Sequence, residues 1–319
     1  MSTGYYPYRN LVFEGGGVKG IAYGGALEVL EQSQITPQIE RVAGTSAGAI
    51  TATMVCLGYT AAEFIQIMMG LDFAKLEDGS DIGGPIRLVE HYGWFKGDYF
   101  LNLMESYIEQ KTGNGRATFR DLTEGGGGFK ELHVFGTDLS QQAVQQFSYQ
   151  TTPEVAVADA VRISMSIPFF FEARNYADDV YCDGGVLNNY PVSTFDAQYT
   201  ATDPETGDTM LHRTPNPQTL GFHLDNLDQP SARPIDNVVR FAGSVFDAIL
   251  DIQNILLKSN PGDERRTVFI NDLGVKTTDF HLSDQLKWEL IAQGRIATSA
   301  YLSKQQLPLP EVKRLLRRA

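Results

Sequence analysis

One serine lies between two glycines in a pattern typical of nucleophilic serines, Gly44-Thr45-Ser46-Ala47-Gly48. In this pattern a sharp strand-to-helix turn holds the serine in a strained backbone conformation, and the flanking glycines let the two arms approach. The hydroxyl then points into the open at the positive end of the following helix. An apolar stretch precedes this turn and a helix-forming stretch follows it, so Ser46 is a candidate nucleophile. The alternative is a tight turn in which Ser46 has no chemical role.

A glycine-rich segment, Gly15-Gly16-Gly17-Val18-Lys19-Gly20, lies one strand–helix–strand unit before this serine. A phosphate-binding P-loop needs Ser or Thr after its lysine, and Gly20 follows Lys19 here. A dinucleotide site needs an acidic residue at the end of the next strand, and that strand ends instead at the Ser46 turn. The remaining interpretation is an oxyanion hole, in which backbone N–H groups point at a developing negative charge.

An activated serine needs a general base, and Asp183 is the candidate. It ends a short apolar strand and is followed by Gly184 and Gly185. Its apolar flank would raise its pKa by desolvation, whereas an ordinary Asp-Gly turn is the alternative interpretation. The five histidines lie in no comparable glycine turn. A Ser–Asp–His triad in hydrolase chain order would need one of the histidines after Asp183, namely His212, His223 or His281.

These residues need a particular arrangement of strands and helices. Apolar periodicity predicts strands at 11–13 and 39–43 and helices at 20–32 and 47–57. Two strands joined by one helix are expected to be parallel, adjacent and connected with a right-handed crossover. Both glycine-rich turns then lie at the carboxyl edge of one sheet, where open α/β sheets bind ligands.

The rest of the chain continues the same alternation and predicts an α/β fold with a mostly parallel sheet. Gly125–Gly128 is read as a surface loop, the polar segment 201–217 as a linker or flap, and the apolar segment 86–100 as a lid or membrane-interface segment. Because elements continue past the linker, we expect a single domain over 1–319, its motif-bearing core at about 9–195 and residues 196–319 completing or capping it. Further strands are predicted at 131–137, 146–149, 169–171, 180–182, 220–224 and 267–270, and helices at 99–110, 153–165, 234–257 and 283–303.

Composition narrows the function classes. The 319 residues carry a formal net charge of −13, which argues against nucleic acid and against standing attraction to anionic lipid. The last ten residues, 310–319, are a basic exception, read as a helix end that complements its dipole or as a small membrane or partner contact. Two cysteines, Cys56 and Cys182, form no disulfide framework. No signal peptide or spanning segment is recognisable, so we expect a protein that acts from solution.

Three motifs in order resemble the patatin-like phospholipases over about residues 9–195. They are the glycine-rich segment 15–20, the Ser46 turn, and the stretch Asp183-Gly184-Gly185-Val186-Leu187-Asn188-Asn189-Tyr190-Pro191, and residues 160–168 resemble the helix that precedes this stretch in the family. Two positions depart from the family pattern. Glu14 stands where many members have Asp, and Lys19 stands where Arg is usual, which keeps the charge but loses the planar guanidinium.

The resemblance implies a three-layer α/β sandwich and a serine-dependent lipid acyl hydrolase of the phospholipase A or lysophospholipase type. It implies a Ser–Asp dyad, with Ser46 as the acyl-accepting nucleophile and Asp183 as the general base, and neither metal nor cofactor. The oxyanion hole would come from backbone N–H groups of Gly15, Gly16, Gly17 and Val18. Motif support would come from Lys19, Gly20, Gly44, Gly48, Gly184 and Gly185.

The resemblance also sets expectations about partners. The substrate would be a phospholipid or another acyl lipid, reached by transient contact with a membrane surface, and some relatives need an activating protein or small-molecule signal. The protein would be cytoplasmic or a secreted effector without a visible signal peptide, and peripheral to the membrane when active. Two alternatives stay open: a catalytically weak lipid-binding or regulatory module on the same fold, and an α/β-hydrolase esterase with a Ser-His-Asp triad.

Overall fold

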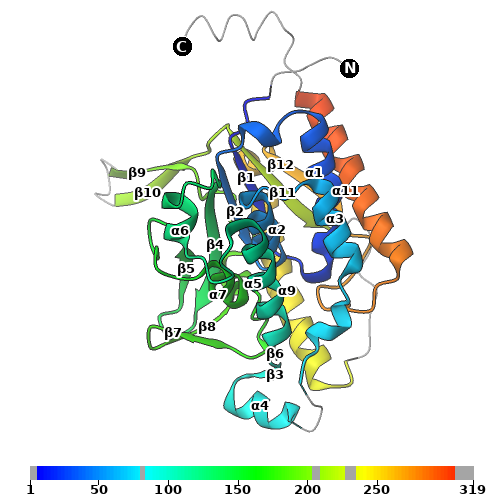
Figure 1. Cartoon of the computed structure of the whole chain (residues 1–319). Helices are drawn as coiled ribbons and strands as arrows, with labels where there is room; N and C mark the ends of the chain where they lie inside the picture. Colours follow the sequence, from blue (N-terminus) through cyan, green and yellow to red (C-terminus); the bar gives the residue numbers. More distant parts are fainter. Residues whose placement is uncertain (1–5, 80–82, 203–208, 227–234, 306–319) are drawn as a thin grey trace, which may run out of the picture.

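The computed structural model describes residues 6–79, 83–202, 209–226 and 235–305. An eight-stranded sheet in the order β12-β11-β1-β2-β4-β8-β7, with β5 also paired to β4, runs through the molecule (Figure 1). Its strands are β1 (Asn10–Phe13), β2 (Arg41–Thr45), β4 (Glu131–Asp138), β5 (Ala143–Phe147), β7 (Arg174–Tyr176), β8 (Asp179–Asp183), β11 (Thr219–Asp225) and β12 (Thr267–Asn271). Two small sheets join β3 (Gly93–Phe95) to β6 (Phe169–Phe171) and β9 (Ala197–Thr202) to β10 (Thr209–Thr214).

Helices cover both faces of this sheet. The α-helices are α1 (Tyr23–Gln32), α2 (Ala47–Cys56), α3 (Ala61–Gly70), α4 (Gly84–Glu90), α5 (Asp98–Thr112), α6 (Phe119–Glu124), α7 (Val157–Ser164), α8 (Gly185–Asn188), α9 (Val238–Lys258), α10 (Pro261–Glu264) and α11 (Asp284–Gln305). Short 3₁₀ helices are η1 (Gly17–Ala22), η2 (Thr36–Gln38) and η3 (Phe73–Leu76). Within the described part of the chain, no helix has the length and apolar character needed to cross a membrane.

Strand pairing brings the three sequence motifs together. Strands β12, β11, β1, β2 and β4 run parallel, and Phe13 at the end of β1 lies beside Gly44 of β2. Thr45, the residue before Ser46, pairs with Phe135 of β4. On the other side of β4, Gly136 pairs with Asp183 of the antiparallel strand β8. The two glycine-rich turns therefore lie at the same edge of the sheet, as predicted. Strand β4 lies between β2, which leads to Ser46, and β8, which ends at Asp183.

Alternate residues of the central strands pack on opposite faces of the sheet. Leu11, Phe13 and Val42 belong to a large hydrophobic cluster with α1 and α2, whereas Val12 and Ala43 belong to a second cluster with Phe135 and Phe195. His223 of β11 lies on the second face and is hydrogen-bonded to Asn254 of α9. The chain thus forms the three-layer α/β sandwich that the sequence predicts.

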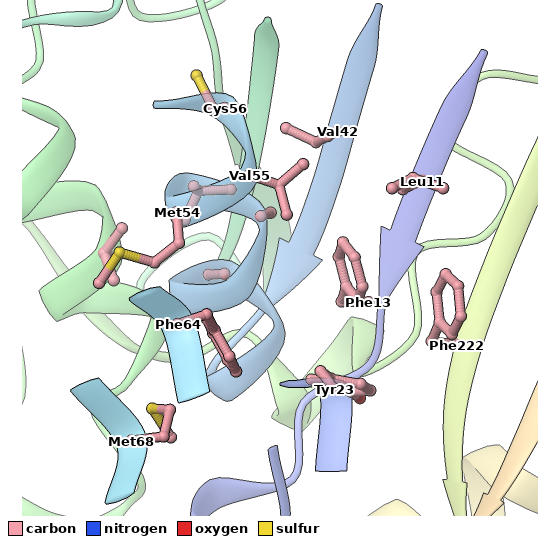
Figure 2. Packing of buried hydrophobic residues seen from close by; sticks show 14 of the residues in the cluster. Leu11, Phe13, Tyr23, Val42, Met54, Val55, Cys56, Phe64, Met68 and Phe222 are labelled. Carbon is pink, nitrogen blue, oxygen red and sulfur yellow. The ribbon is translucent and has the colours of Figure 1, made fainter. Parts of the chain in front are cut away.

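The large cluster reaches the glycine-rich segment through aromatic contacts. Figure 2 shows Phe13 with Tyr23 below it and Phe222 to its right. The Phe13 and Phe222 rings stack at 5.1 Å, and Tyr23 meets Phe13 edge to face at 5.3 Å. The buried Tyr23 hydroxyl donates to the carbonyl of Glu14 at 2.7 Å, which fixes the start of the loop to the core.

The structure corrects two sequence-based predictions. The segment 201–217, predicted as a linker or flap, is not a linker: its described part is mostly sheet, because β9 and β10 pair antiparallel, with Ala197 opposite Thr214 and Thr202 opposite Thr209. The predicted helix 20–32 begins as the 3₁₀ helix η1, three residues earlier, and helix α3 was not predicted at all. The segment 86–100 contains most of α4, all of β3 and the start of α5, and its role as a lid or membrane-interface segment stays a prediction. The basic segment 310–319 lies outside the described residues.

Candidate active site

Ser46 has the strained backbone that its motif predicts. It caps the N-terminus of α2 with φ 52° and ψ −124°, a conformation that residues other than glycine rarely adopt. Such strain is concentrated at functional sites, where the surrounding structure must hold it. The side chain is buried, and its backbone N–H donates to Ser164 Oγ at 2.8 Å. Ser164 Oγ in turn donates to the Phe135 carbonyl, so β4 and the end of α7 together hold the turn.

The glycines around Ser46 are required by close approach of two backbones. A Cβ atom at Gly48 would lie 2.2 Å from the Phe13 carbonyl oxygen, and one at Gly44 would lie 2.2 Å from the Gly48 carbonyl oxygen. Neither distance is compatible with any side chain, since these neighbours are backbone atoms in the sheet and helix. The Gly-x-Ser-x-Gly pattern therefore sets how closely β1, β2 and α2 meet.

Asp183 is fully buried at the end of β8, and its two carboxylate oxygens differ. Oδ1 accepts a 2.7 Å hydrogen bond from the Gly185 N–H, whereas Oδ2 has no hydrogen-bond partner among the described residues. Burial raises the pKa of the Asp183 carboxyl to about 7, although the Gly185 N–H and the nearby Ser46 hydroxyl each lower it. The Ser46 hydroxyl also lies 3.5 Å from Met165 Sδ, a weak acceptor. A carboxyl with one free oxygen and a pKa near neutrality thus lies beside a strained serine.

The glycine-rich segment lies against Ser46, with its N–H groups unequally engaged. A Cβ atom at Gly15 would lie 3.0 Å from Ser46 Cβ. The Gly15 N–H donates to the Asn189 carbonyl at 3.0 Å, and the Val18 N–H donates to the Thr277 carbonyl at 3.2 Å. Within the described residues, the N–H groups of Gly16 and Gly17 have no acceptor. Gly17 has a φ of +56°, and a Cβ atom there would lie 2.0 Å from the Thr277 carbonyl oxygen.

Asn189 links the glycine-rich segment to the turn after Asp183. It lies in the Asp183 motif, but no role was predicted for it. Its buried Nδ2 donates to Glu14 Oε1 at 2.9 Å and to the Gly15 carbonyl at 3.1 Å. Its N–H donates to Gln253 Oε1 of α9 at 2.8 Å, and Gln253 Nε2 donates to the Gly185 carbonyl at 2.7 Å. The sequence places Asn189 six residues after Asp183, but residue type alone does not distinguish Asn189 from Asn188.

Lys19 and Glu14, the two departures from the family pattern, both form buried polar contacts. Lys19 Nζ pairs with Asp272 Oδ2 at 3.0 Å, and although burial lowers the pKa of Lys19, Asp272 and Glu14 raise it overall. Glu14 Oε2 accepts from the Leu224 N–H at 2.7 Å, and burial raises the pKa of the Glu14 carboxyl to about 8. These contacts fix the loop to β11 and to the segment after β12.

The remaining motif glycines lie in the same region. Gly20 in η1 faces Ala47, whose Cβ would be 2.9 Å from a Cβ at Gly20. Gly184 and Gly185 form the turn after Asp183, and a Cβ at Gly184 would lie 2.3 Å from the Phe135 carbonyl oxygen. All of the predicted site residues are therefore brought together around Ser46.

The three histidines considered for a triad lie elsewhere. His212 and His281 are exposed, and His212 stacks on Tyr199 at 5.4 Å. His223 is buried behind the glycine loop, where Nε2 lies 3.0 Å from Asn254 Oδ1 and 3.2 Å from Glu14 Oε1. Burial lowers the pKa of His223, which favours the neutral ring. In the described part of the chain, no hydrogen bond joins a histidine to Ser46 or Asp183.

An apolar cavity adjoins the serine. It encloses about 640 Å³ of empty space, part of which is open solvent at its mouth. Ala47 follows Ser46 in the chain, and Met165 contacts its hydroxyl; both line this cavity. Figure 2 shows Met54 of α2 near Phe64 and Met68 of α3, and all three also line it. Among the residues that the structure describes, no cluster of His, Cys, Asp and Glu is suited to hold a metal ion.

Comparisons with known proteins agree with this geometry. Residues 11–196 match the model of the patatin-like phospholipase family. The uncharacterized protein YqhO of Bacillus subtilis is 31% identical over 313 residues, which cover 93% of this chain and 99% of YqhO. A probable lipid hydrolase, 463L of Invertebrate iridescent virus 6, is 28% identical over 58% of this chain and 62% of its own length.

The fold is also similar to a solved structure. VipD from Legionella pneumophila superimposes with a TM-score of 0.64 at 19% identity, covering 94% of this chain and 68% of VipD. The family match spans more than half of the chain and contains Ser46, Asp183 and the glycine-rich segment. The chain therefore belongs to the patatin-like phospholipase family, and it is a lipid acyl hydrolase.

Proposed function

We propose that this chain hydrolyses fatty-acyl esters of phospholipids or related lipids through an acyl-enzyme on Ser46, with Asp183 as general base. The observation that carries this proposal is the buried Asp183 Oδ2, which has no hydrogen-bond partner available among the described residues other than the neighbouring hydroxyl of Ser46, a serine in a strained turn. A buried acceptor left without a donor costs free energy, so a chemical role is the natural reason to keep it. The adjoining apolar cavity suits a fatty-acyl chain.

The first half-reaction transfers the acyl group to the protein. Asp183 Oδ2 accepts the Ser46 hydroxyl proton while Oγ bonds to the ester carbonyl carbon. The carbonyl oxygen becomes an oxyanion, which the Gly16 and Gly17 N–H groups stabilise because they have no acceptor among the residues that the structure describes. The ester C–O bond then breaks, and Asp183 returns the proton to the leaving alcohol oxygen.

The second half-reaction releases the fatty acid. Water attacks the acyl carbon, Asp183 takes a water proton, and the same two N–H groups hold the second oxyanion. When the bond to Oγ breaks, the proton passes from Asp183 to Ser46, which regenerates the starting state. The Gly15 and Val18 N–H groups already donate to carbonyls, so they serve to hold the loop in this mechanism.

A fluorophosphonate probe and a short soluble ester test this proposal directly. The probe is expected to label Ser46 in the intact protein, located by mass spectrometry, and Ser46→Ala is expected to abolish both labelling and turnover. Asp183→Asn is expected to lower kcat by about 10²–10⁴-fold, the range attributed to general acid–base catalysis.

Two variants serve as matched controls for this test. Asp179→Asn changes a carboxylate on the same strand, β8, and Ser303→Ala removes an exposed hydroxyl from α11; both are expected to keep wild-type turnover. Fatty-acid release by Ser46→Ala at the wild-type rate would contradict the proposal. Strong loss of turnover on substitution of His223 alone, with the fold intact, would favour the histidine triad instead.

A further inference from the structure

Helix α9 has an apolar face that no described part of the chain covers. Phe246, Leu250 and Leu257 point into the protein and are buried. The outward face consists of Val238, Phe241, Val245, Ile252, Ile255 and Leu256, of which Ile255 is 66% exposed. Their spacing of three, four or seven residues places them in one stripe along the helix. An exposed apolar stripe of this size marks a docking surface, because isolated soluble proteins rarely expose one.

Elements near α9 also expose apolar side chains. In α4, Ile86 is exposed and Val89 is 78% exposed, and α4 packs on β3. Strand β3 pairs with β6, which contacts α9 in turn. Figure 1 shows α4, the β3–β6 pair and one end of α9 at the same end of the molecule. We call the outward face of α9, together with Ile86, Val89 and Phe169, the docking face.

Phe169 of β6 combines a strained backbone with an exposed ring. Its φ is +65°, an outlier for an aromatic residue, and its side chain is 51% exposed. Phe169 lies two residues after Ile167, which lines the apolar cavity that adjoins Ser46. An exposed aromatic side chain at this position is suited to lipid binding, because aromatic side chains favour the membrane–water interface.

The charges around the docking face favour an uncharged lipid surface. The formal charges of Arg240, Lys258, Asp247 and Asp251 sum to zero within α9, and those of Arg87 and Glu90 sum to zero within α4. Both helices therefore have zero formal charge in a chain whose net charge is −13. The three cations, Arg240, Lys258 and Arg87, are each paired with a carboxylate outside their own helix, namely Asp236, Asp225 and Glu172. An anionic surface would be repelled by the rest of the protein, whereas a zwitterionic surface is not.

We propose that the docking face binds the surface of a zwitterionic phospholipid bilayer, with α9 lying in the plane of the interface. The inference rests on the proposed function because Phe169 of the docking face lies between Ile167 and Phe171, which both line the cavity assigned to the acyl chain. Gln253 of α9 hydrogen-bonds to Gly185 and Asn189, so the helix that meets the lipid also holds the turn after Asp183.

The test is co-sedimentation of the full chain, in the Ser46→Ala background, with phosphatidylcholine vesicles. The double variant Ile252→Ser/Ile255→Ser is expected to bind about tenfold more weakly or less, since two apolar side chains no longer leave water. Ile296→Ser on α11 is the matched control, because Ile296 is 60% exposed and Ile252 is 62% exposed. Adding phosphatidylserine to the vesicles is expected to weaken binding.

Activity measurements separate this inference from the proposed function. With Ser46 intact, the double variant is expected to keep wild-type turnover of a short soluble ester and to release about tenfold less fatty acid from vesicles. Vesicle binding needs no turnover, so it tests the docking face even if the chain hydrolyses neither substrate. Equal binding by the parent and the double variant would overturn the inference. So would a wild-type dimer in sedimentation equilibrium that the double variant dissociates, with no vesicle binding by either.

Discussion

Ionisation of Asp183 is expected to oppose the stability of the fold. Its ordinary pKa is 3.8, and burial raises the pKa in the folded protein to about 7. Between these values the folded state binds a proton that the unfolded state releases. The stabilising contribution of this proton is therefore complete below about pH 4 and is lost as pH rises through about 7. Asp183 is the residue best placed to act as a base, and holding it in its charged form lowers the free energy of unfolding.

Asp183→Asn is therefore expected to stabilise the protein more as pH rises. Each pKa unit corresponds to about 1.4 kcal/mol, so the gain in the free energy of unfolding at pH 8 is expected to be about 2–4 kcal/mol. Urea unfolding of wild type and variant at pH 5 and pH 8 measures it. The difference between the two proteins should widen from pH 5 to pH 8. Asp179→Asn should show no such widening, and a constant difference for Asp183→Asn would contradict the raised pKa.

At the scale of elements, the glycine loop depends on a segment more than 250 residues later. The Lys19–Asp272 ion pair and the Val18–Thr277 hydrogen bond join η1 to the segment after β12. Lys19 is 14% exposed and Asp272 4% exposed at the side chain, so loss of one partner leaves a nearly buried charge unpaired. The loop that we propose to hold the oxyanion is thus positioned by residues outside the family-model match.

A double-mutant cycle on this pair tests the connection. Lys19→Met and Asp272→Asn are each expected to lower the free energy of unfolding by about 3 kcal/mol, the usual cost of breaking a buried pair. The double variant is expected to lose less than the sum of the two, because neither charge is then stranded. Each single variant should also lower kcat for a soluble ester by about tenfold or more through displacement of the loop. Additive effects on stability would contradict a direct interaction.

The sequence was sufficient for the motifs and for the elements that carry them. Gly44, Ser46 and Gly48 lie on a strand and a helix with strong local patterns, so their turn and its place in the sheet could be predicted. Helix α3 could also have been found, since Thr60 and Glu63 form the reciprocal capping pattern at its start. Local chemistry specifies these features without help from distant residues.

Long-range partners could not be predicted in the same way. The β9–β10 pair consists of polar, threonine-rich segments whose composition resembles that of a linker. Each segment is a strand because it is hydrogen-bonded to the other, which composition alone does not indicate. Which loop N–H groups are already engaged depends on Asn189 and Thr277, whose positions follow from the assembled fold. The outward face of α9 had a clear helical pattern, but periodicity alone does not tell which apolar residues face water.

For the whole molecule, we propose that residues 1–319 form one folding domain. Strand β1 lies between β2, from the motif-bearing core at about 9–195, and β11, from residues 196–319. Both parts of the chain therefore contribute strands to the same sheet. Helices α1 and α11 also approach closely, because a Cβ atom at Gly25 of α1 would lie 1.8 Å from the Ile291 carbonyl oxygen of α11, and one at Gly294 of α11 would lie 1.9 Å from the Ala22 carbonyl oxygen of η1. Removal of either part would expose the apolar surface of the other.

The two tryptophans allow a test of this single domain. Trp94 lies in β3, and Trp288 lies in α11, so Trp288→Phe and Trp94→Phe proteins report on the two parts separately by fluorescence. Their urea transitions are expected to coincide. Gly294→Ala should shift both by about 1–3 kcal/mol through overpacking, whereas Gly70→Ala, with open space around it, should shift neither to this extent. Separate transitions for the two tryptophans would show two domains.

The central position of β1 has a consequence for synthesis of the protein. Strand β1 is made early, but its neighbour β11 begins at Thr219 and the Thr277 carbonyl that holds Val18 comes later still. Contacts of such large sequence separation form slowly and late. A nascent chain on the ribosome would therefore carry Ser46 and Asp183 without a seated glycine loop. We therefore expect the proposed site to be complete, and lipid hydrolysis to begin, only after Thr277 has emerged from the ribosome.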